Sequence, residues 1–286
     1  MPSKELEAFN SAALSRKKLL SSAYDPVALR EVFLNEPSYA ANPWKTEHLG
    51  GATLEHRGKR EASRKVVYVA GGGFCFPAHD PHRNFVDTVC NHLEASGTIL
   101  HHRLAPEHRF PAAHEDVVAG LAKILADDNG KTINIIADSS GAALVLTALE
   151  VLRDTGKAMA SRCVFLSPLT DLAMSGLSHV YNSELDPMFG PEAIIHKGWH
   201  YLQGANPTDS RASPLWGNPT GLPPMLLIAG STETMLDDTL RYAEKINDAG
   251  GEATVSICES APHVFPLQLH FPEAQNALSE ILSFLD

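Results

Sequence analysis

The sequence predicts an α/β protein with a mostly parallel central sheet flanked by helices and covered by a helical cap. From residue 65 onward, short runs of β-forming residues alternate with longer stretches of helical periodicity. This alternation is typical of a parallel sheet whose two faces are both covered by helices. Two stretches interrupt the alternation, one at the start of the chain and one near residue 200, and we expect both to contribute to the cap.

The expected strands are short apolar runs bounded by turn-forming residues. They are KVVYVA (65–70), GTILHHRL (97–104), TINIIAD (132–138), RCVFLSPL (162–169), PPMLLIAG (223–230) and EATVSICES (252–260). The expected helices lie between these strands and carry apolar residues at helical spacing. They are FVDTVCNHLEASG (85–97), EDVVAGLAKILADD (115–128), SSGAALVLTALEVLRDTG (139–156), DDTLRYAEKINDAG (237–250) and PEAQNALSEILSFLD (272–286).

The chain has 286 residues, enough to bury a sizeable core, and we expect one α/β unit with two cap segments. Residues 1–45 have helical character and precede any predicted strand, so they form an N-terminal helical cap segment. Residues 180–214 are too long for a simple connection between strands and are assigned to inserted cap helices. Residues 46–179 and 215–286 then form the two parts of the core, and the insertion is well placed to cover a binding site.

Charge and composition exclude several classes of partner. With 23 basic and 34 acidic residues the net charge is −11, and no basic run is present, so we expect no nucleic-acid partner. The amino terminus has no apolar core of signal-peptide length, and no window approaches the length of a membrane span, which predicts a cytoplasmic protein without membrane insertion. A homodimer is left open. The widely spaced cysteines are expected to be reduced and buried: Cys75, Cys90, Cys163 and Cys258.

The fourteen histidines do not form a recognisable metal-binding pattern. His196 and His200 have the i, i+4 spacing of a helical metal site, but the glutamate of H-E-x-x-H and a third ligand are missing. His79 and His82 share one loop, and histidines on helix surfaces are the structural alternative to a metal site. We therefore expect neither a metal nor a cofactor.

Ser139 stands at the junction of a predicted strand and a predicted helix, with no loop between them. Its surroundings, A-D-S-S-G, fit the nucleophile-elbow pattern G-x-S-x-G with Ala137 in the first glycine position. Small residues are needed there because the sharp turn brings the helix close to the strand. A helix-capping serine is the structural alternative, and Ser140 would serve equally well in that role.

A serine hydroxyl becomes a good nucleophile only when a base takes its proton and a carboxylate orients that base. The strand at 223–230 is followed by Glu233, Asp237 and Asp238, and the last strand is followed by His263. Because parallel strands end at one edge of the sheet, these residues can converge on Ser139. The order serine, acid, histidine is that of the α/β-hydrolase fold.

Three glycines, Gly71 to Gly73, directly follow the first predicted parallel strand. Glycine at that point suggests that bare backbone N–H groups are needed, either for a phosphate or for an oxyanion. The phosphate-binding patterns G-x-x-x-x-G-K-[ST] and G-x-G-x-x-G do not fit the sequence. We therefore expect Gly72, Gly73 and Ser140 to donate the N–H groups of an oxyanion hole.

Over residues 60–286 the chain resembles the hormone-sensitive-lipase-like carboxylesterases, which have the α/β-hydrolase fold. The matching segments are AGGGF (70–74), RLAPEHRFPAAHEDV (103–117), ADSSGA (137–142), LSPLTDL (166–172) and the Asp186–Pro187 pair. The resemblance implies an eight-stranded sheet with a cap. It places Glu233 at the family's acid position, Asp237 at its second acidic position and His263 at its catalytic histidine.

Three positions depart from the family's pattern. Ala70 replaces the leading histidine of the oxyanion loop, Ala137 replaces a glycine, and His101–His102 replace Asp-Tyr. The first departure implies a less firmly held loop, so that restoring histidine at position 70 would raise turnover. Arg103 and Glu107, by contrast, are interpreted as structural polar partners.

The residues and the resemblance together predict a serine carboxylesterase that hydrolyses short- to medium-chain esters through an acyl-enzyme. The catalytic residues are expected to be Ser139, Glu233 and His263, and the cap residues expected near the pocket mouth are Leu185, Met188, Phe189, Trp199 and Tyr201. One alternative is a lactone or amide hydrolase that uses the same triad. Another is a non-catalytic small-molecule receptor, because plant gibberellin receptors resemble the same family but lack its catalytic histidine.

Overall fold

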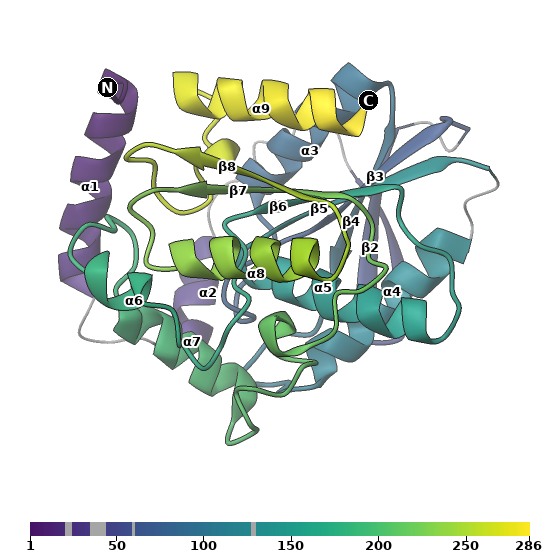
Figure 1. Ribbon diagram of the computed structural model, residues 1–286, viewed down its shortest axis with the longest axis horizontal. Coiled ribbons are helices and arrows are strands. Elements are labelled where there is room, and N and C mark those ends of the chain that lie inside the picture. Colours follow the sequence, from purple (N-terminus) through teal and green to yellow (C-terminus); the bar gives the residue numbers. More distant parts are fainter. Residues whose placement is uncertain (21–24, 35–43, 59–60, 127–129) are drawn as a thin grey trace.

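The computed structural model describes residues 1–20, 25–34, 44–58, 61–126 and 130–286. Within these ranges, eight strands form one twisted sheet that lies between two layers of helices (Figure 1). The spatial order of the strands is β1-β2-β4-β3-β5-β6-β7-β8. The pairs β1–β2 and β2–β4 are antiparallel. The other six strands, β3 to β8, all run parallel to one another. The predicted α/β class with a mostly parallel sheet is confirmed.

The strands occupy the segments β1 (Lys45–Leu49), β2 (Ala52–Arg57), β3 (Arg64–Val69), β4 (Ser96–His101), β5 (Thr132–Asp138), β6 (Arg162–Leu166), β7 (Met225–Gly230) and β8 (Ala253–Cys258). The helices are α1 (Lys4–Leu20), α2 (Pro26–Leu34), α3 (Asp80–Leu93), α4 (Ala112–Ala126), α5 (Ser139–Asp154), α6 (Ser178–Tyr181), α7 (Pro191–Leu202), α8 (Leu236–Asp248) and α9 (Pro272–Leu285). Helices α3 and α9 cover one face of the sheet, and α4, α5 and α8 cover the other (Figure 1).

All six predicted strands are present, but the antiparallel strands β1 and β2 were not predicted. The sequence of β1, KTEHL, is charged and its side chains are mostly exposed, so it lacks the apolar run that marks a buried strand. The hairpin turn between β1 and β2 contains Gly50, whose φ of +58° is readily adopted by glycine. Parts of two predicted helical segments, residues 21–24 and 35–43 and residues 127–128, lie outside the described residues.

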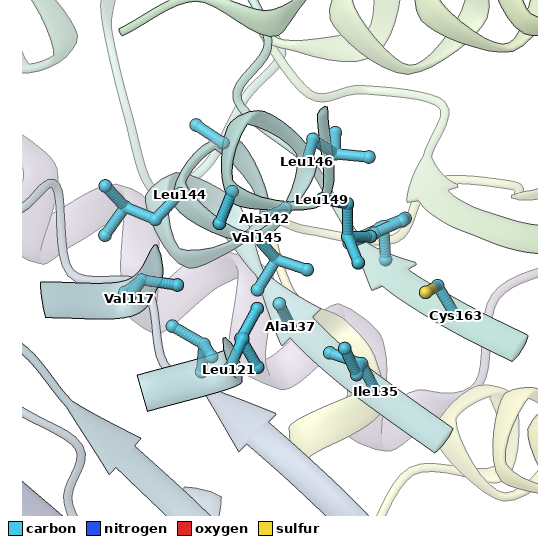
Figure 2. Close-up of a cluster of buried hydrophobic side chains, with 14 of the residues drawn as sticks. Val117, Leu121, Ile135, Ala137, Ala142, Leu144, Val145, Leu146, Leu149 and Cys163 are labelled. Carbon is cyan, nitrogen blue, oxygen red and sulfur yellow. The ribbon is translucent and has the colours of Figure 1, made fainter. Parts of the chain in front are cut away.

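The core on one face of the sheet is built largely from α5, which runs directly from the end of β5. Figure 2 shows Ala142, Val145 and Leu149 of this helix facing Ile135 and Ala137 of the strand. All five side chains are fully buried. Truncating a leucine in such a core typically costs about 2–5 kcal/mol, so this packing fixes the helix against the sheet and, with it, the position of the β5–α5 junction.

Helices α1, α2, α6 and α7 gather at the end of the sheet where the parallel strands end (Figure 1). The Nζ atom of Lys17 on α1 donates hydrogen bonds to the backbone oxygens of Ser183 (2.7 Å) and Asp186 (2.8 Å), and so links the two cap segments. The division of the chain at residues 45, 179 and 214 stays a prediction.

Candidate active site

Ser139 lies at a sharp turn between β5 and α5 and has a positive φ of +50°. This conformation is costly for a residue other than glycine and is common at functional turns. The helix begins so close to the sheet that a Cβ atom at position 141 would lie 2.3 Å from the carbonyl oxygen of Val69. Ala137, in contrast, is a strand residue that pairs with Val69 and Phe165, so its side chain is tolerated where the family has glycine.

Two hydrogen bonds connect the three residues that sequence analysis selected. The Oγ atom of Ser139 lies 3.0 Å from Nε2 of His263, and Nδ1 of His263 lies 2.8 Å from Oε2 of Glu233. All three side chains are buried, and Glu233 has no exposed surface. Because a carboxylate can only accept, the shared proton belongs to Nδ1, which leaves Nε2 free to accept from the serine hydroxyl.

The second carboxylate oxygen of Glu233 is held by two donors. The backbone N–H of Gly230 lies 2.5 Å from Oε1, and the hydroxyl of Ser167 donates to the same oxygen over 2.7 Å. The Ser167 oxygen in turn accepts the backbone N–H of Val264 at 2.9 Å. Ser167 therefore ties the glutamate to the residue next to His263. Sequence analysis assigned no role to it, although it follows β6 at the same edge of the sheet.

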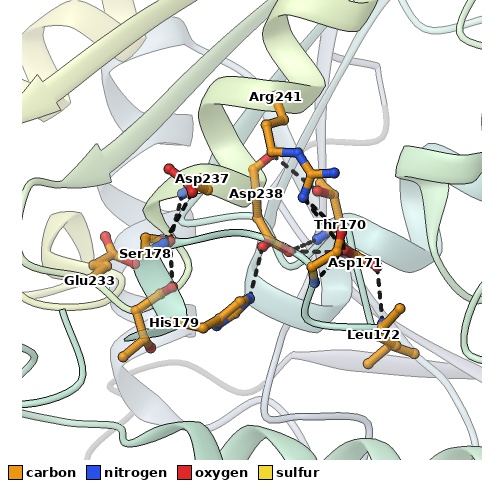
Figure 3. Close-up of polar contacts among 12 residues, drawn as sticks. Thr170, Asp171, Leu172, Ser178, His179, Glu233, Asp237, Asp238 and Arg241 are labelled. Atoms are coloured by element: carbon orange, nitrogen blue, oxygen red, sulfur yellow. Dashed lines mark hydrogen bonds and ion pairs between the residues drawn. The ribbon is translucent and has the colours of Figure 1, made fainter. Parts of the chain in front are cut away.

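Asp237 and Asp238 hold the loops around the site (Figure 3). The Asp237 carboxylate accepts the backbone N–H of Ser178 at 3.0 Å. The Asp238 carboxylate accepts the backbone N–H groups of Thr170 (2.6 Å) and Asp171 (2.9 Å). Both aspartates lie in the first turn of α8, but neither caps it, because that helix begins after Met235 without a capping side chain.

The turn that carries Glu233 is anchored to the inserted cap segment. The side-chain amide of Asn182 donates to the backbone oxygen of Glu233 at 2.9 Å. The carboxylate of Asp186 accepts both the backbone N–H of Thr234 (2.9 Å) and its hydroxyl (3.1 Å). Asn182 and Asp186 thus position the turn that carries Glu233, a role that the sequence did not indicate. The geometry of this turn depends on a cap segment about 50 residues earlier in the chain.

The glycine-rich loop after β3 passes directly beside the elbow. Gly72 and Gly73 have φ values of +102° and +62°, a region that glycine adopts without steric cost. Phe74 donates its backbone N–H to the Ser140 hydroxyl oxygen at 3.1 Å, so the loop and the elbow are joined. Among the described residues, no protein acceptor is found for the backbone N–H groups of Gly72 and Gly73. These groups are therefore available to a ligand.

Asp138 holds the start of this glycine-rich loop. The family has a histidine just before the glycines, at the position of Ala70 in this chain. Its Oδ1 atom accepts the backbone N–H of Gly71 at 3.0 Å and the hydroxyl of Tyr68 at 2.7 Å. Burial raises the pKa of Asp138, and the hydrogen bond from Tyr68 opposes that shift. Ala70 borders a cavity of about 20 Å³, shared with His102. That volume suits one water molecule rather than an imidazole, so the structure gives little room for the family's histidine.

Arg103 and Glu107, two further polar residues in the segments that resemble the family, each form an ion pair within the protein. The guanidinium of Arg103 makes a bidentate ion pair with Asp116, with its shortest contact 2.8 Å from Nη2 to Oδ1. Glu107 pairs with Arg30 on α2 at 2.6 Å. Both contacts agree with the interpretation of Arg103 and Glu107 as structural partners.

The histidines considered for a metal form two pairs on different elements of the fold. The backbone N–H of His79 donates to Nδ1 of His82 at 3.1 Å at the start of α3, and burial lowers the pKa of both side chains. His196 and His200 lie on the cap helix α7. In the part of the chain that the structure describes, no three histidine, cysteine, aspartate or glutamate side chains are grouped to hold a metal ion. The thiols of Cys75, Cys90 and Cys163 are buried as expected, and Cys258 is half-buried.

The cap residues expected at the pocket mouth have different surroundings. Phe189 lies edge-on against His263, with ring centroids 5.1 Å apart. Leu185 and Trp199 are largely exposed. Tyr201 is fully buried and stacks on Phe74 of the glycine loop at a centroid distance of 3.8 Å, so it supports the loop from within the core.

Comparisons with known proteins agree with this architecture. A family profile described as the alpha/beta hydrolase fold matches residues 66–267. The chain belongs to that family. An acetyl-hydrolase from Streptomyces hygroscopicus is 32% identical over 244 residues, which cover 83% of this chain and 80% of the relative. An esterase from Acinetobacter venetianus is 29% identical over 275 residues, which cover 94% of this chain and 90% of the relative.

Solved structures place this α/β hydrolase within one branch of the family. An esterase from the bacterial hormone-sensitive lipase family superposes with a TM-score of 0.87 at 29% identity, covering 100% of this chain and 98% of that chain. An esterase/lipase from an uncultured bacterium gives a TM-score of 0.89 at 29% identity, covering 99% and 98%. The resemblance to hormone-sensitive-lipase-like carboxylesterases is confirmed, and the chain is a carboxylic-ester hydrolase. None of the helices in the described ranges has both the length and the apolar character of a membrane span.

Proposed function

We propose that this α/β hydrolase is a serine esterase in which Ser139, His263 and Glu233 form the catalytic triad. The observation that supports the proposal is the continuous chain of hydrogen bonds from Ser139 Oγ through the imidazole to Glu233, at 3.0 and 2.8 Å. This arrangement matches the roles of nucleophile, general base and orienting carboxylate.

The reaction begins when Ser139 Oγ attacks the carbonyl carbon of the ester and Nε2 of His263 takes the hydroxyl proton. The imidazolium that forms is stabilised by Glu233, whose carboxylate stays ionised. The tetrahedral intermediate collapses as Nε2 delivers the proton to the leaving alkoxide, which departs as an alcohol. Water, activated by the same imidazole, then attacks the acyl-enzyme, releases the carboxylic acid and restores the serine.

The oxyanion of each tetrahedral intermediate is bound by backbone N–H groups of Gly72, Gly73 and Ser140. The glycines are available because their φ values turn the loop away from regular pairing, and Ser140 lies in the first turn of α5. Helix N-termini favour negative charge, which adds to the stabilisation at Ser140. Loss of one such donor typically costs about 3 kcal/mol of transition-state stabilisation.

The substrate is a small ester with a short to medium acyl chain. The cap helices lie over the end of the sheet that carries Ser139, and Phe189 contacts the catalytic imidazole, which favours a covered pocket over an open groove. The acetyl-hydrolase among the relatives also supports a short acyl group. No cofactor is required by this mechanism.

Covalent labelling tests the proposal. Diisopropyl fluorophosphate should phosphorylate Ser139, so that mass spectrometry finds one diisopropylphosphoryl group on the peptide that contains the elbow. The Ser139→Ala variant should remain unlabelled while keeping its melting temperature. A non-catalytic receptor would show no labelling of either protein, and labelling that persists in Ser139→Ala would contradict the assigned nucleophile.

A further inference from the structure

Lys197, a lysine of the cap, contacts both the glycine-rich loop and the aromatic ring that lies against His263. Lys197 lies on α7, and its side chain covers Gly73 so closely that a Cβ atom at position 73 would lie 2.3 Å from the lysine Cδ and 2.9 Å from its Cβ and Cγ. Its Nζ atom lies 4.1 Å from the centroid of the Phe189 ring. That ring in turn lies against His263. The lysine stem therefore touches the oxyanion loop, and its ammonium group stands over the aromatic ring beside the catalytic histidine.

The side chain of Lys197 is half-buried, and its ammonium group lies against neighbouring side chains. Burial lowers the pKa of Lys197 to about 8, so the group remains charged at neutral pH. The thiol of Cys75 lies close enough to influence that pKa, but burial raises the pKa of the thiol itself to about 11, so at neutral pH the thiol is uncharged. The face of Phe189 offers partial stabilisation through a cation–π contact. A partly desolvated cation in such a place interacts strongly with any anion that shares the site.

We propose that Lys197 is a specificity-determining residue that favours esters carrying a carboxylate group a few atoms from the scissile bond. The inference rests on the proposed serine-esterase function and adds a class of substrate to it. The ester carbonyl oxygen would bind at the N–H groups of Gly72 and Gly73. Since the lysine stem lies on Gly73, a carboxylate on the same small molecule would come within reach of the ammonium group. The charge-assisted hydrogen bond between them would then orient the ester for attack.

Paired substrates separate this role from general catalysis. Monomethyl glutarate carries a carboxylate on its acyl side and is compared with the neutral methyl pentanoate. Carboxymethyl acetate carries its carboxylate on the alcohol side and is compared with ethyl acetate. For each pair the measured quantity is the ratio of kcat/KM for the anionic ester to that for the neutral ester.

In Lys197→Met, which keeps the apolar stem, we expect this ratio to fall at least about tenfold in one pair, while the neutral esters change by less than about threefold. Lys197→Arg keeps the positive charge and should retain most of the preference. The matched control Lys157→Met removes a charge from an exposed site beyond α5 and should leave both ratios unchanged.

Ratios that stay within about twofold in both pairs would overturn the inference, and so would an equal loss on anionic and neutral esters, which would indicate a structural role for Lys197. Either result leaves the serine-esterase proposal intact as long as the wild-type protein hydrolyses the neutral esters and is labelled at Ser139. Absence of labelling and of hydrolysis would instead contradict the proposed function.

Discussion

Replacing Glu233 by glutamine is expected to disable the site through the direction of a single amide group. The backbone N–H of Gly230 lies 2.5 Å from Oε1 and can only donate. The amide oxygen of the introduced glutamine must therefore occupy the Oε1 position, which puts its NH2 group at the Oε2 position, 2.8 Å from Nδ1 of His263. That NH2 group donates to Nδ1 and forces the imidazole proton onto Nε2. In that tautomer the histidine cannot accept the proton of Ser139.

We expect kcat for a soluble activated ester to fall by about 10³–10⁴-fold in Glu233→Gln, equivalent to about 4–5.5 kcal/mol of activation free energy. The folded state should lose little stability, because glutamine keeps the bonds to Gly230, Ser167 and His263. The assays are hydrolysis of p-nitrophenyl acetate and a thermal melt of the same preparation. Turnover above about one tenth of the wild-type value would refute the reasoning on the tautomer.

Asp238→Asn is the matched control, since Asp238 is as fully buried as Glu233. Its carboxylate binds the backbone of Thr170 and Asp171 and does not contact the imidazole of His263. We expect this variant to lose about 1–3 kcal/mol of stability while its turnover stays within about tenfold of wild type. Asp237→Asn should likewise act mainly on stability. A larger loss of turnover in either aspartate variant than in Glu233→Gln would assign the orienting acid elsewhere.

Four further outcomes are expected. Ser139→Ala should lower ester turnover at least about a thousandfold, whereas Ser140→Ala keeps its backbone N–H and should be mild; a more severe effect of Ser140→Ala in steady-state kinetics would show that the elbow is misplaced. Ala70→His should lower the melting temperature rather than raise turnover, because the adjoining cavity of about 20 Å³ cannot take an imidazole; unchanged stability with faster turnover would contradict this. Activity should peak at acyl chains of about two to eight carbons, with each fitting methylene contributing about 0.8 kcal/mol, and efficient hydrolysis of emulsified long-chain triglycerides would oppose the covered pocket. Burial lowers the folded-state pKa of His114 to about 4 from 6.5, so its contribution to stability is complete above pH 6.5 and is lost as the pH falls toward 4; melts should become less pH-dependent in His114→Gln, and an identical slope would exclude His114 as a source.

The parallel part of the fold and the position of Ser139 at a strand–helix junction were predictable from the sequence because their signals are local. An apolar run marks a buried strand, and the small residues around Ser139 mark a sharp junction with the following helix. His263 was predictable for a related reason, since the carboxyl ends of parallel strands meet at one edge of the sheet. The β1–β2 hairpin gave no such signal, because its charged residues form a strand only through pairing with β4.

The family resemblance selected Glu233 over Asp237 and Asp238, but only the tertiary structure gave the physical reason for that choice. All three follow β7 within eight residues, so the sequence offers three carboxylates of nearly equal standing. Glu233 lies in the turn before α8 and faces His263, while the helix directs both aspartates toward loops after β6. Side-chain direction depends on where a helix begins and how it packs.

The sequence also gave no signal for the contacts that Ser167 and Lys197 make with distant segments. Ser167 reaches Glu233 across 66 positions, and Lys197 lies on Gly73 because the cap helix α7 packs over the loop after β3. The sequence by itself determined the parallel strands of the sheet, the sharp junction at Ser139 and the kinds of residue at the edge of the sheet, because these follow from local periodicity and backbone chemistry. Which side chains meet was decided by the tertiary structure, because such contacts depend on the packing of elements that are far apart along the chain.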